Sequence, residues 1–159
     1  MRAQSKPRRA RLTPVTTTLT DPVLEWDFAP FTEQVSLQAP DVVPAVEYSG
    51  ITILGAQATD GKDYLSTEGA RFNGAGTPGV RRSIVYTPAA DGVITVTFRS
   101  NNSNYRRLHI ADSELNELIQ ADAASAEVDA SATLHAGTTY YMWIDNGGGG
   151  TFTKIRYEL

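Results

Sequence analysis

The chain has 159 residues, enough for one domain, and 41% of them are hydrophobic, enough to fill a core. It contains no cysteine, which excludes disulfide bonds, a thiolate nucleophile and zinc held by cysteine. No apolar run approaches the ~20 residues of a membrane span, and no signal peptide is visible, because the first fourteen residues carry charges without an apolar segment.

The net charge of −4 is divided unevenly along the chain. Residues 1–14 hold five cations and no acid, whereas the remainder holds nine cations and eighteen acids. The five cations are Arg2, Lys6, Arg8, Arg9 and Arg11. By composition we expect residues 1–14 to form a flexible basic arm, which is either solvated or ordered against a partner. The expected partner is the acidic face of a neighbouring subunit; nucleic acid is the weaker alternative, because an acidic body repels phosphate.

Residues 15–159 are predicted to form a single domain of short strands. Residues 15–19 and 23–28 read as the first two, with Trp26 and Phe28 on one face and directed into the core. Prolines at positions 30, 40 and 44 predict an irregular stretch. Short strands follow at residues 51–54, 64–65, 71–72 and 83–87, with turns around Asp60-Gly61 and the glycine loop 73–79.

Residues 92–111 carry the strongest strand pattern. Ile94, Val96 and Phe98 alternate with polar residues, and Leu108 and Ile110 repeat the alternation after a stretch of Ser and Asn. A period of two with β-branched residues predicts half-buried strands. We therefore expect a hairpin here, at the centre of a β-sandwich.

The next segment allows two interpretations. Residues 112–117 read as a further turn between strands, but Leu115, Leu118 and Ile119 also have the spacing of a helix over residues 114–126. The all-β surroundings favour strands. Residues 128–134, 138–145 and 151–159 complete about ten strands, which predicts an all-β antiparallel sandwich of jelly-roll type.

Motifs for catalysis or for a cofactor are weak. Gly74, Gly76 and Gly79 spell GxGxxG, but a strand follows where a dinucleotide site needs a helix, so we interpret the segment as a loop. Asp60 and Asp63, or Asp145, could bind calcium through oxygen atoms, although solvated turns are commoner. The chain is predicted to be non-catalytic and to need no cofactor.

Aromatic and cationic residues near the turns suggest a binding surface. On residues 138–145, Met142 and Ile144 mark the core face, so Tyr141, Trp143 and Asp145 would lie on the other. Aromatic rings stack on sugars, and guanidinium groups bind carboxylates. The predicted glycan contacts are Arg81, Arg82, Tyr105, Arg106, Arg107, Tyr141, Trp143 and Asp145. The alternative is that Trp143 packs under a neighbouring loop and the arginines are solvated.

Three segments carry a resemblance to a known family. They are R-S-I-V-Y-T-P-A-A-D-G-V-I-T-V-T-F-R-S-N-N-S at residues 82–103, R-R-L-H-I-A-D at 106–112, and A-G-T-T-Y-Y-M-W-I-D-N-G-G-G-G-T-F-T-K-I-R-Y at 136–157. Together with W-D-F and G-I-T-I-L-G earlier, they resemble the β-sandwich accessory modules of bacterial extracellular pectate lyases and related polysaccharide-active enzymes. The resemblance covers residues 23–159 and implies a non-catalytic module that binds polysaccharide.

Two hypotheses of function follow. The first is an extracellular carbohydrate-binding or adhesive module whose ligand is a polysaccharide, and the arginines favour an acidic one. This hypothesis predicts that Trp143→Ala abolishes retention on polysaccharide and leaves the thermal midpoint nearly unchanged. The second is a structural subunit of a homo-oligomeric assembly, such as a coat, fibre or decoration protein of a phage particle, with the basic arm on a neighbouring subunit. No membrane partner is expected.

Overall fold

A computed structural model describes residues 23–159 of the chain. The predicted basic arm of residues 1–14 and the predicted strand at residues 15–19 lie outside these described residues. The contact of the arm with a neighbouring subunit therefore stays a prediction.

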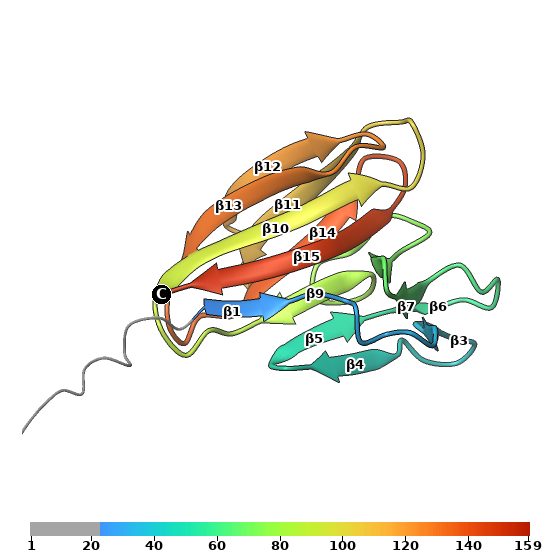
Figure 1. Cartoon of the computed structure of the whole chain (residues 1–159), viewed down its shortest axis with the longest axis horizontal. Coiled ribbons are helices and arrows are strands. Elements are labelled where there is room, and N and C mark those ends of the chain that lie inside the picture. The colour runs from blue at the N-terminus through green and yellow to red at the C-terminus, as the bar shows by residue number, and fades with distance from the viewer. Residues whose placement is uncertain (1–22) are drawn as a thin grey trace, which may run out of the picture.

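The described residues form a β-sandwich of jelly-roll type (Figure 1). Its fifteen strands are β1 (Val23–Trp26), β2 (Val35–Ser36), β3 (Gln38–Ala39), β4 (Ala45–Tyr48), β5 (Ile51–Leu54), β6 (Ala56–Gln57), β7 (Tyr64–Ser66), β8 (Gly69–Arg71), β9 (Ser83–Tyr86), β10 (Gly92–Ser100), β11 (Arg106–Asp112), β12 (Glu117–Ala123), β13 (Val128–Leu134), β14 (Tyr140–Asp145) and β15 (Gly150–Glu158).

Two antiparallel sheets make up the two layers. The seven-stranded sheet has the order β13-β10-β15-β8-β7-β2, with β1 also paired to β15, and the six-stranded sheet has the order β12-β11-β14-β9-β5-β4. The strands number more than the ten expected, because the proline-containing stretch still forms two-residue pairings: β3 pairs with β6 in parallel, and β2 pairs with β7. The predicted all-β fold is confirmed.

The predicted hairpin of residues 92–111 is wrong, although both of its strands exist. β10 pairs with β13 and β15 in one sheet, while β11 pairs with β12 and β14 in the other. The Ser- and Asn-rich segment therefore crosses from one sheet to the facing sheet. Asn101 anchors the crossing, since its Nδ2 donates to the Phe72 carbonyl (2.8 Å) and its Oδ1 accepts from the Thr151 hydroxyl (2.6 Å).

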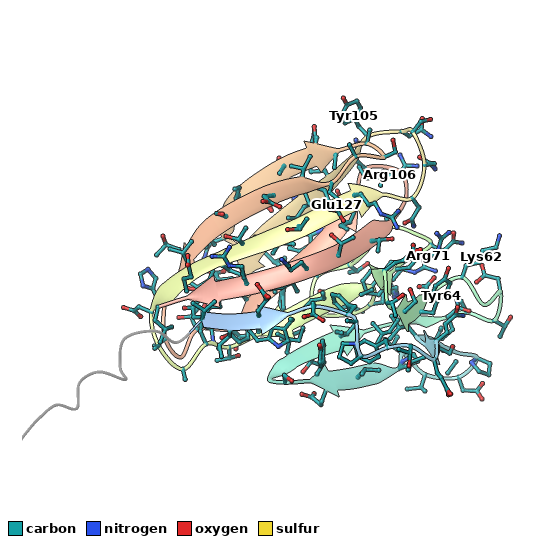
Figure 2. All side chains as sticks on the ribbon, in the orientation of Figure 1. Lys62, Tyr64, Arg71, Tyr105, Arg106 and Glu127 are labelled. Atoms are coloured by element: carbon teal, nitrogen blue, oxygen red, sulfur yellow. The ribbon has the colours of Figure 1, made fainter. Side chains whose placement is uncertain are left out.

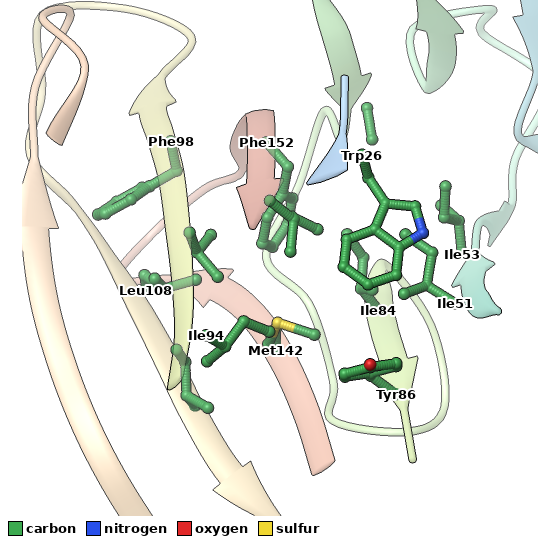
Figure 3. Close-up of a cluster of buried hydrophobic side chains, with 14 of the residues drawn as sticks. Trp26, Ile51, Ile53, Ile84, Tyr86, Ile94, Phe98, Leu108, Met142 and Phe152 are labelled. Atoms are coloured by element: carbon green, nitrogen blue, oxygen red, sulfur yellow. The ribbon is translucent and has the colours of Figure 1, made fainter. Parts of the chain in front are cut away.

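The core lies between the sheets, and the expected alternation fills it from both sides (Figure 3). Ile94, Val96 and Phe98 of β10 are fully buried against Leu108 and Ile110 of β11. Trp26, Phe28, Met142 and Ile144 are buried too, as predicted. At ~25 cal/mol per Å² of buried apolar surface, this cluster is the main favourable term in folding.

Residues 117–123 form strand β12, so the alternative prediction of a helix over residues 114–126 is wrong. β11 and β12 are joined by a turn in which the Asp112 carboxylate accepts from the amides of Glu114 and Asn116, each at 2.9 Å. Leu115, 56% exposed, lies in this turn with a φ of 67°. Leu118 and Ile119 have helical spacing, but Ile119 pairs with Ile110 across the sheet.

The sandwich has two ends with different contents. One, which we call the loop end, consists of residues 58–63, 72–82, 101–105, 124–127 and 146–149, which connect strands from both sheets. The opposite end holds the turns at residues 87–91, 113–116 and 135–139, together with Val23 and Glu158, which pair with each other. Residues 23–159 contain no helix able to span a membrane.

Candidate functional site

The loop end is where most of the predicted site residues gather, but the structure gives them different roles. Figure 2 shows Tyr105 and Arg106 there, with Lys62, Tyr64 and Arg71 on another side of the same end. Tyr105 is 64% exposed and follows the crossing segment directly. It is a large aromatic side chain presented to solvent, and its role as a glycan contact stays a prediction.

Arg82 is engaged in a buried ion pair within the protein, and its role as a glycan contact stays a prediction. Its Nε donates to the carboxylate of Asp63 at 2.7 Å, and the Asp63 side chain is fully buried. Asp63 also accepts from the Asn73 amide (3.0 Å) and from Gln38 Nε2 (3.1 Å). This buried ion pair joins three segments, and removal of one partner from such a pair costs about 3–5 kcal/mol.

Arg106 holds two loops of the loop end together. Its Nη1 donates to the carbonyl oxygens of Tyr105 (3.2 Å) and Asn146 (3.3 Å), while its Nε is buried without a hydrogen-bond partner among the described residues. A Cβ atom at Gly148 would lie 2.6 Å from that Nε, so the guanidinium packs directly against the Gly148 backbone. Arg106 thus supports the backbone beneath the exposed Tyr105 ring.

Trp143 is buried, which agrees with the part of the alternative interpretation that packs it under a loop, whereas the arginines of that alternative are not all solvated. Its side chain lies on the outer face of the six-stranded sheet, as the alternation predicted, but only 7% of the residue is exposed. The indole stacks on the His109 ring of β11, with centroids 4.7 Å apart and planes 8° from parallel. Nε1 of Trp143 donates to Asp145 at 3.4 Å.

The carboxylates around His109 complete this cluster. Asp145 lies 2.7 Å from His109 Nε2, and Glu117 lies 3.0 Å from His109 Nδ1. In the next row of the sheet, Arg107 donates to Asp122 at 2.8 Å, and this hydrogen bond holds the pKa of the Asp122 carboxyl below its usual range. Arg107 and Asp145, both predicted glycan contacts, are therefore engaged with other protein side chains.

The glycine loop at residues 73–79 covers the outer face of the six-stranded sheet beside β14. Cβ atoms at Gly76 and Gly79 would lie 3.0 Å from the Cβ of Trp143 and 2.6 Å from the ring of Tyr141. Tyr141 is consequently half-buried. The GxGxxG spacing reflects close contact with aromatic residues, and strand β9 follows the loop as expected.

Cations without an acidic partner gather at the loop end. Of the nine Lys and Arg residues between positions 23 and 159, five pair with a carboxylate. The four that form no ion pair with another described residue are Lys62, Arg71, Arg81 and Arg106. All four lie in, or directly next to, the loops of this end. Three carboxylates are also present there: Asp63, which pairs with Arg82, Asp60, and the exposed Glu127.

Sequence reasoning missed Tyr64 and Arg71. They are directly opposite each other on β7 and β8, and the Arg71 guanidinium carbon lies 5.8 Å from the centre of the Tyr64 ring. Both side chains are half-exposed. The two strands were expected. The short turn between them determines that Tyr64 pairs with Arg71, and the alternation pattern does not identify this pairing.

The carboxylates considered for calcium already accept hydrogen bonds from the protein. Asp60 accepts from Gln38 Nε2 (2.8 Å) and from the Lys62 amide (3.1 Å), and these bonds lower its pKa. Asp63 and Asp145 are bound as described above, so a calcium ion would have to displace these donors. The described residues contain no group of three or more His, Asp or Glu side chains arranged to hold a metal ion.

Several solved structures are similar in fold, at low sequence identity. The C-terminal CBM6 of LamC, a marine laminarinase from Zobellia galactanivorans, matches at 11% identity over 87% of this chain and all of that one, with a TM-score of 0.43. A family 35 carbohydrate binding module from an environmental isolate matches at 19% identity, over 79% of this chain and 91% of that one, with a TM-score of 0.42.

The CBM36-1 domain of a multidomain xylanase from the hindgut metagenome of Trinervitermes trinervoides matches at 13% identity, over 56% of this chain and 86% of that one, with a TM-score of 0.38. No protein-family model and no curated protein matches the chain. The association with pectate lyases therefore stays a prediction.

Proposed function

We propose that the protein is a non-catalytic, extracellular module that binds acidic polysaccharide at its loop end. One observation carries the proposal: the exposed Tyr105 ring and the four cations without an acidic partner lie at one end of residues 23–159, a region with more acids than cations. An aromatic ring provides a flat apolar surface for a sugar, and unpaired cations attract carboxylate or sulfate groups.

The outer face of the six-stranded sheet is less suited to a ligand. There the donors and acceptors of Arg107, His109 and Asp145 bind one another, and Trp143 is covered. A ligand at that face would have to break these contacts. At the loop end, Tyr105 is exposed and none of the four cations is in an ion pair with another described residue, so a ligand there would break no ion pair.

The test is retention of the full chain by immobilised or gel-embedded polysaccharides, one acidic (polygalacturonate) and one neutral (laminarin). We expect Tyr105→Ala to weaken retention on the acidic polymer about tenfold, or ~1.4 kcal/mol. The free energy of unfolding of this variant should stay within ~0.5 kcal/mol of that of wild type, because the side chain is exposed. Raising the salt concentration should weaken binding to the acidic polymer only.

Leu115→Ala is the matched control, because it removes a similarly exposed large side chain at the opposite end of the sandwich. It should leave retention unchanged. Equal losses for Tyr105→Ala and Leu115→Ala, or no retention of the wild type on any acidic polymer, would contradict the proposed function.

A further inference from the structure

We propose that Arg71 selects the ligand by binding one oxyanion group, a carboxylate or a sulfate, with both terminal nitrogens of its guanidinium. This proposal rests on the proposed function and deepens it, because it names the acidic group of the glycan as the feature recognised and Arg71 as the residue that recognises it.

Two contacts fix the orientation of the Arg71 guanidinium. It lies over the Tyr64 ring at 5.8 Å, within the range of a cation–π interaction. Its Nε donates to the main-chain carbonyl of Lys62 at 3.2 Å. Together the ring contact and the hydrogen bond restrict the positions that the guanidinium can adopt. Little side-chain entropy then remains to be lost on binding.

These contacts leave both terminal nitrogens of Arg71 without a partner among the described residues. The two nitrogens form a planar fork that matches the two oxygens of a carboxylate or sulfate. The carboxylate closest to it along the chain, Glu68, pairs with Arg99 at 3.3 Å. Arg71 therefore differs from Arg82, Arg99 and Arg107, each of which has an acidic partner within the protein.

The surroundings suit an anionic group on a sugar. Lys62, exposed and without an ion pair among the described residues, supplies a second positive charge on the adjoining loop. Tyr64 is half-exposed beneath the guanidinium, so part of its ring is left for contact with the sugar. Figure 2 shows the three side chains together at the loop end.

The experiment compares Arg71→Lys with wild type, in the full chain, against a uronate oligosaccharide, a sulfated oligosaccharide and a neutral one of equal length. Lysine keeps the charge but lacks the fork and its stacking plane. We expect at least tenfold weaker binding of the acidic ligands and no change for the neutral one. The ligand class that loses more affinity identifies the source of the oxyanion.

Arg156→Lys is the matched control, since Arg156 lies on β15 outside the loop end and pairs with Glu158 (2.9 Å). It makes the same substitution away from the proposed site and should leave the affinity for all three ligands unchanged. Arg71→Lys with unchanged affinity, or with equal losses for acidic and neutral ligands, would overturn the proposal while leaving polysaccharide binding intact. Thermal unfolding of both variants confirms that they are folded.

A second measurement separates this proposal from the proposed function. Glucuronate and inorganic sulfate are titrated into the full chain while the Nε–H signal of Arg71, assigned by its loss in Arg71→Lys, is followed by NMR. A saturating shift supports the oxyanion site even if no polysaccharide is retained. No shift with either anion overturns it even if polysaccharide is retained.

Discussion

Two places in this protein stack a cationic or protonatable group on an aromatic ring, and they differ in what surrounds the stack. His109 lies on Trp143 with a carboxylate against each ring nitrogen, and a glycine loop packs against the Cβ of Trp143. Arg71 lies on Tyr64 with one nitrogen bound to a carbonyl and two nitrogens left without a protein partner.

The difference shows how the same pair of residue types can stabilise a fold or serve a ligand. At His109 the hydrogen-bonding groups are satisfied by the protein, so the stack contributes to stability and offers little to a ligand. At Arg71 the ring orients the cation, and its remaining donors stay available to a ligand. Burial and internal partners distinguish the two, and residue type does not.

The largest effect is expected for Trp143→Ala. Because the indole is 7% exposed and packed between His109 and the glycine loop, its loss should lower the free energy of unfolding by about 3 kcal/mol. The earlier expectation of an unchanged thermal midpoint is thereby replaced. Tyr64→Ala, at the open stack, should cost no more than ~1 kcal/mol. Urea unfolding followed by fluorescence measures both, and equal costs would remove the distinction.

His109→Phe should have an intermediate effect. Phenylalanine keeps a ring against Trp143 but removes the contacts to Glu117 and Asp145, both of which are partly exposed and can regain water. We expect a loss of about 1 kcal/mol. His135→Phe is the control, since His135 is exposed and lies 3.9 Å from Asp91; it should change stability by less than ~0.5 kcal/mol. If His109→Phe left the free energy of unfolding unchanged, the contacts to Glu117 and Asp145 would contribute nothing to stability beyond the stacking of the rings.

The smallest effect is expected for the dependence of folding stability on acidic pH, through the pair of Arg107 and Asp122. The pKa of Asp122 is lowered by its hydrogen bond from Arg107, so the pair stabilises the fold at pH values above the ordinary Asp pKa of about 4. This stability is lost as the pH falls through the lower pKa of the folded state. The stability difference between wild type and Arg107→Gln should therefore shrink as the pH falls below the ordinary Asp pKa of about 4. A difference independent of pH would show that the pair is not electrostatic.

The sequence predicted the layers well because alternation reports which side of a strand is buried. It placed Ile94, Phe98, Leu108 and Met142 in the core, and all are buried. Alternation does not report which strands are neighbours, since pairing is set by contacts far apart in the chain. For this reason β10 and β11 were taken as a hairpin when they belong to facing sheets.

The candidate site could be predicted only in part, for the same reason. Trp143 is on the outer face as predicted, but a loop whose path cannot be derived from its composition covers that face. Arg82 resembles its neighbour Arg81 in sequence, and only the fold brings Asp63 against it. Tyr105, which lies in a polar turn, is the predicted aromatic residue that proves to be well exposed.

The pairing of β1 with the last residues of β15 has a practical consequence for binding assays. A tag or sensor surface joined at Leu159 would lie at the end of the sandwich away from Tyr105 and Arg71. Coupling through amines would modify the proposed binding surface in part of the molecules, because the chain has three lysines and one of them is Lys62. Attachment through the carboxyl terminus keeps the loop end facing the solution.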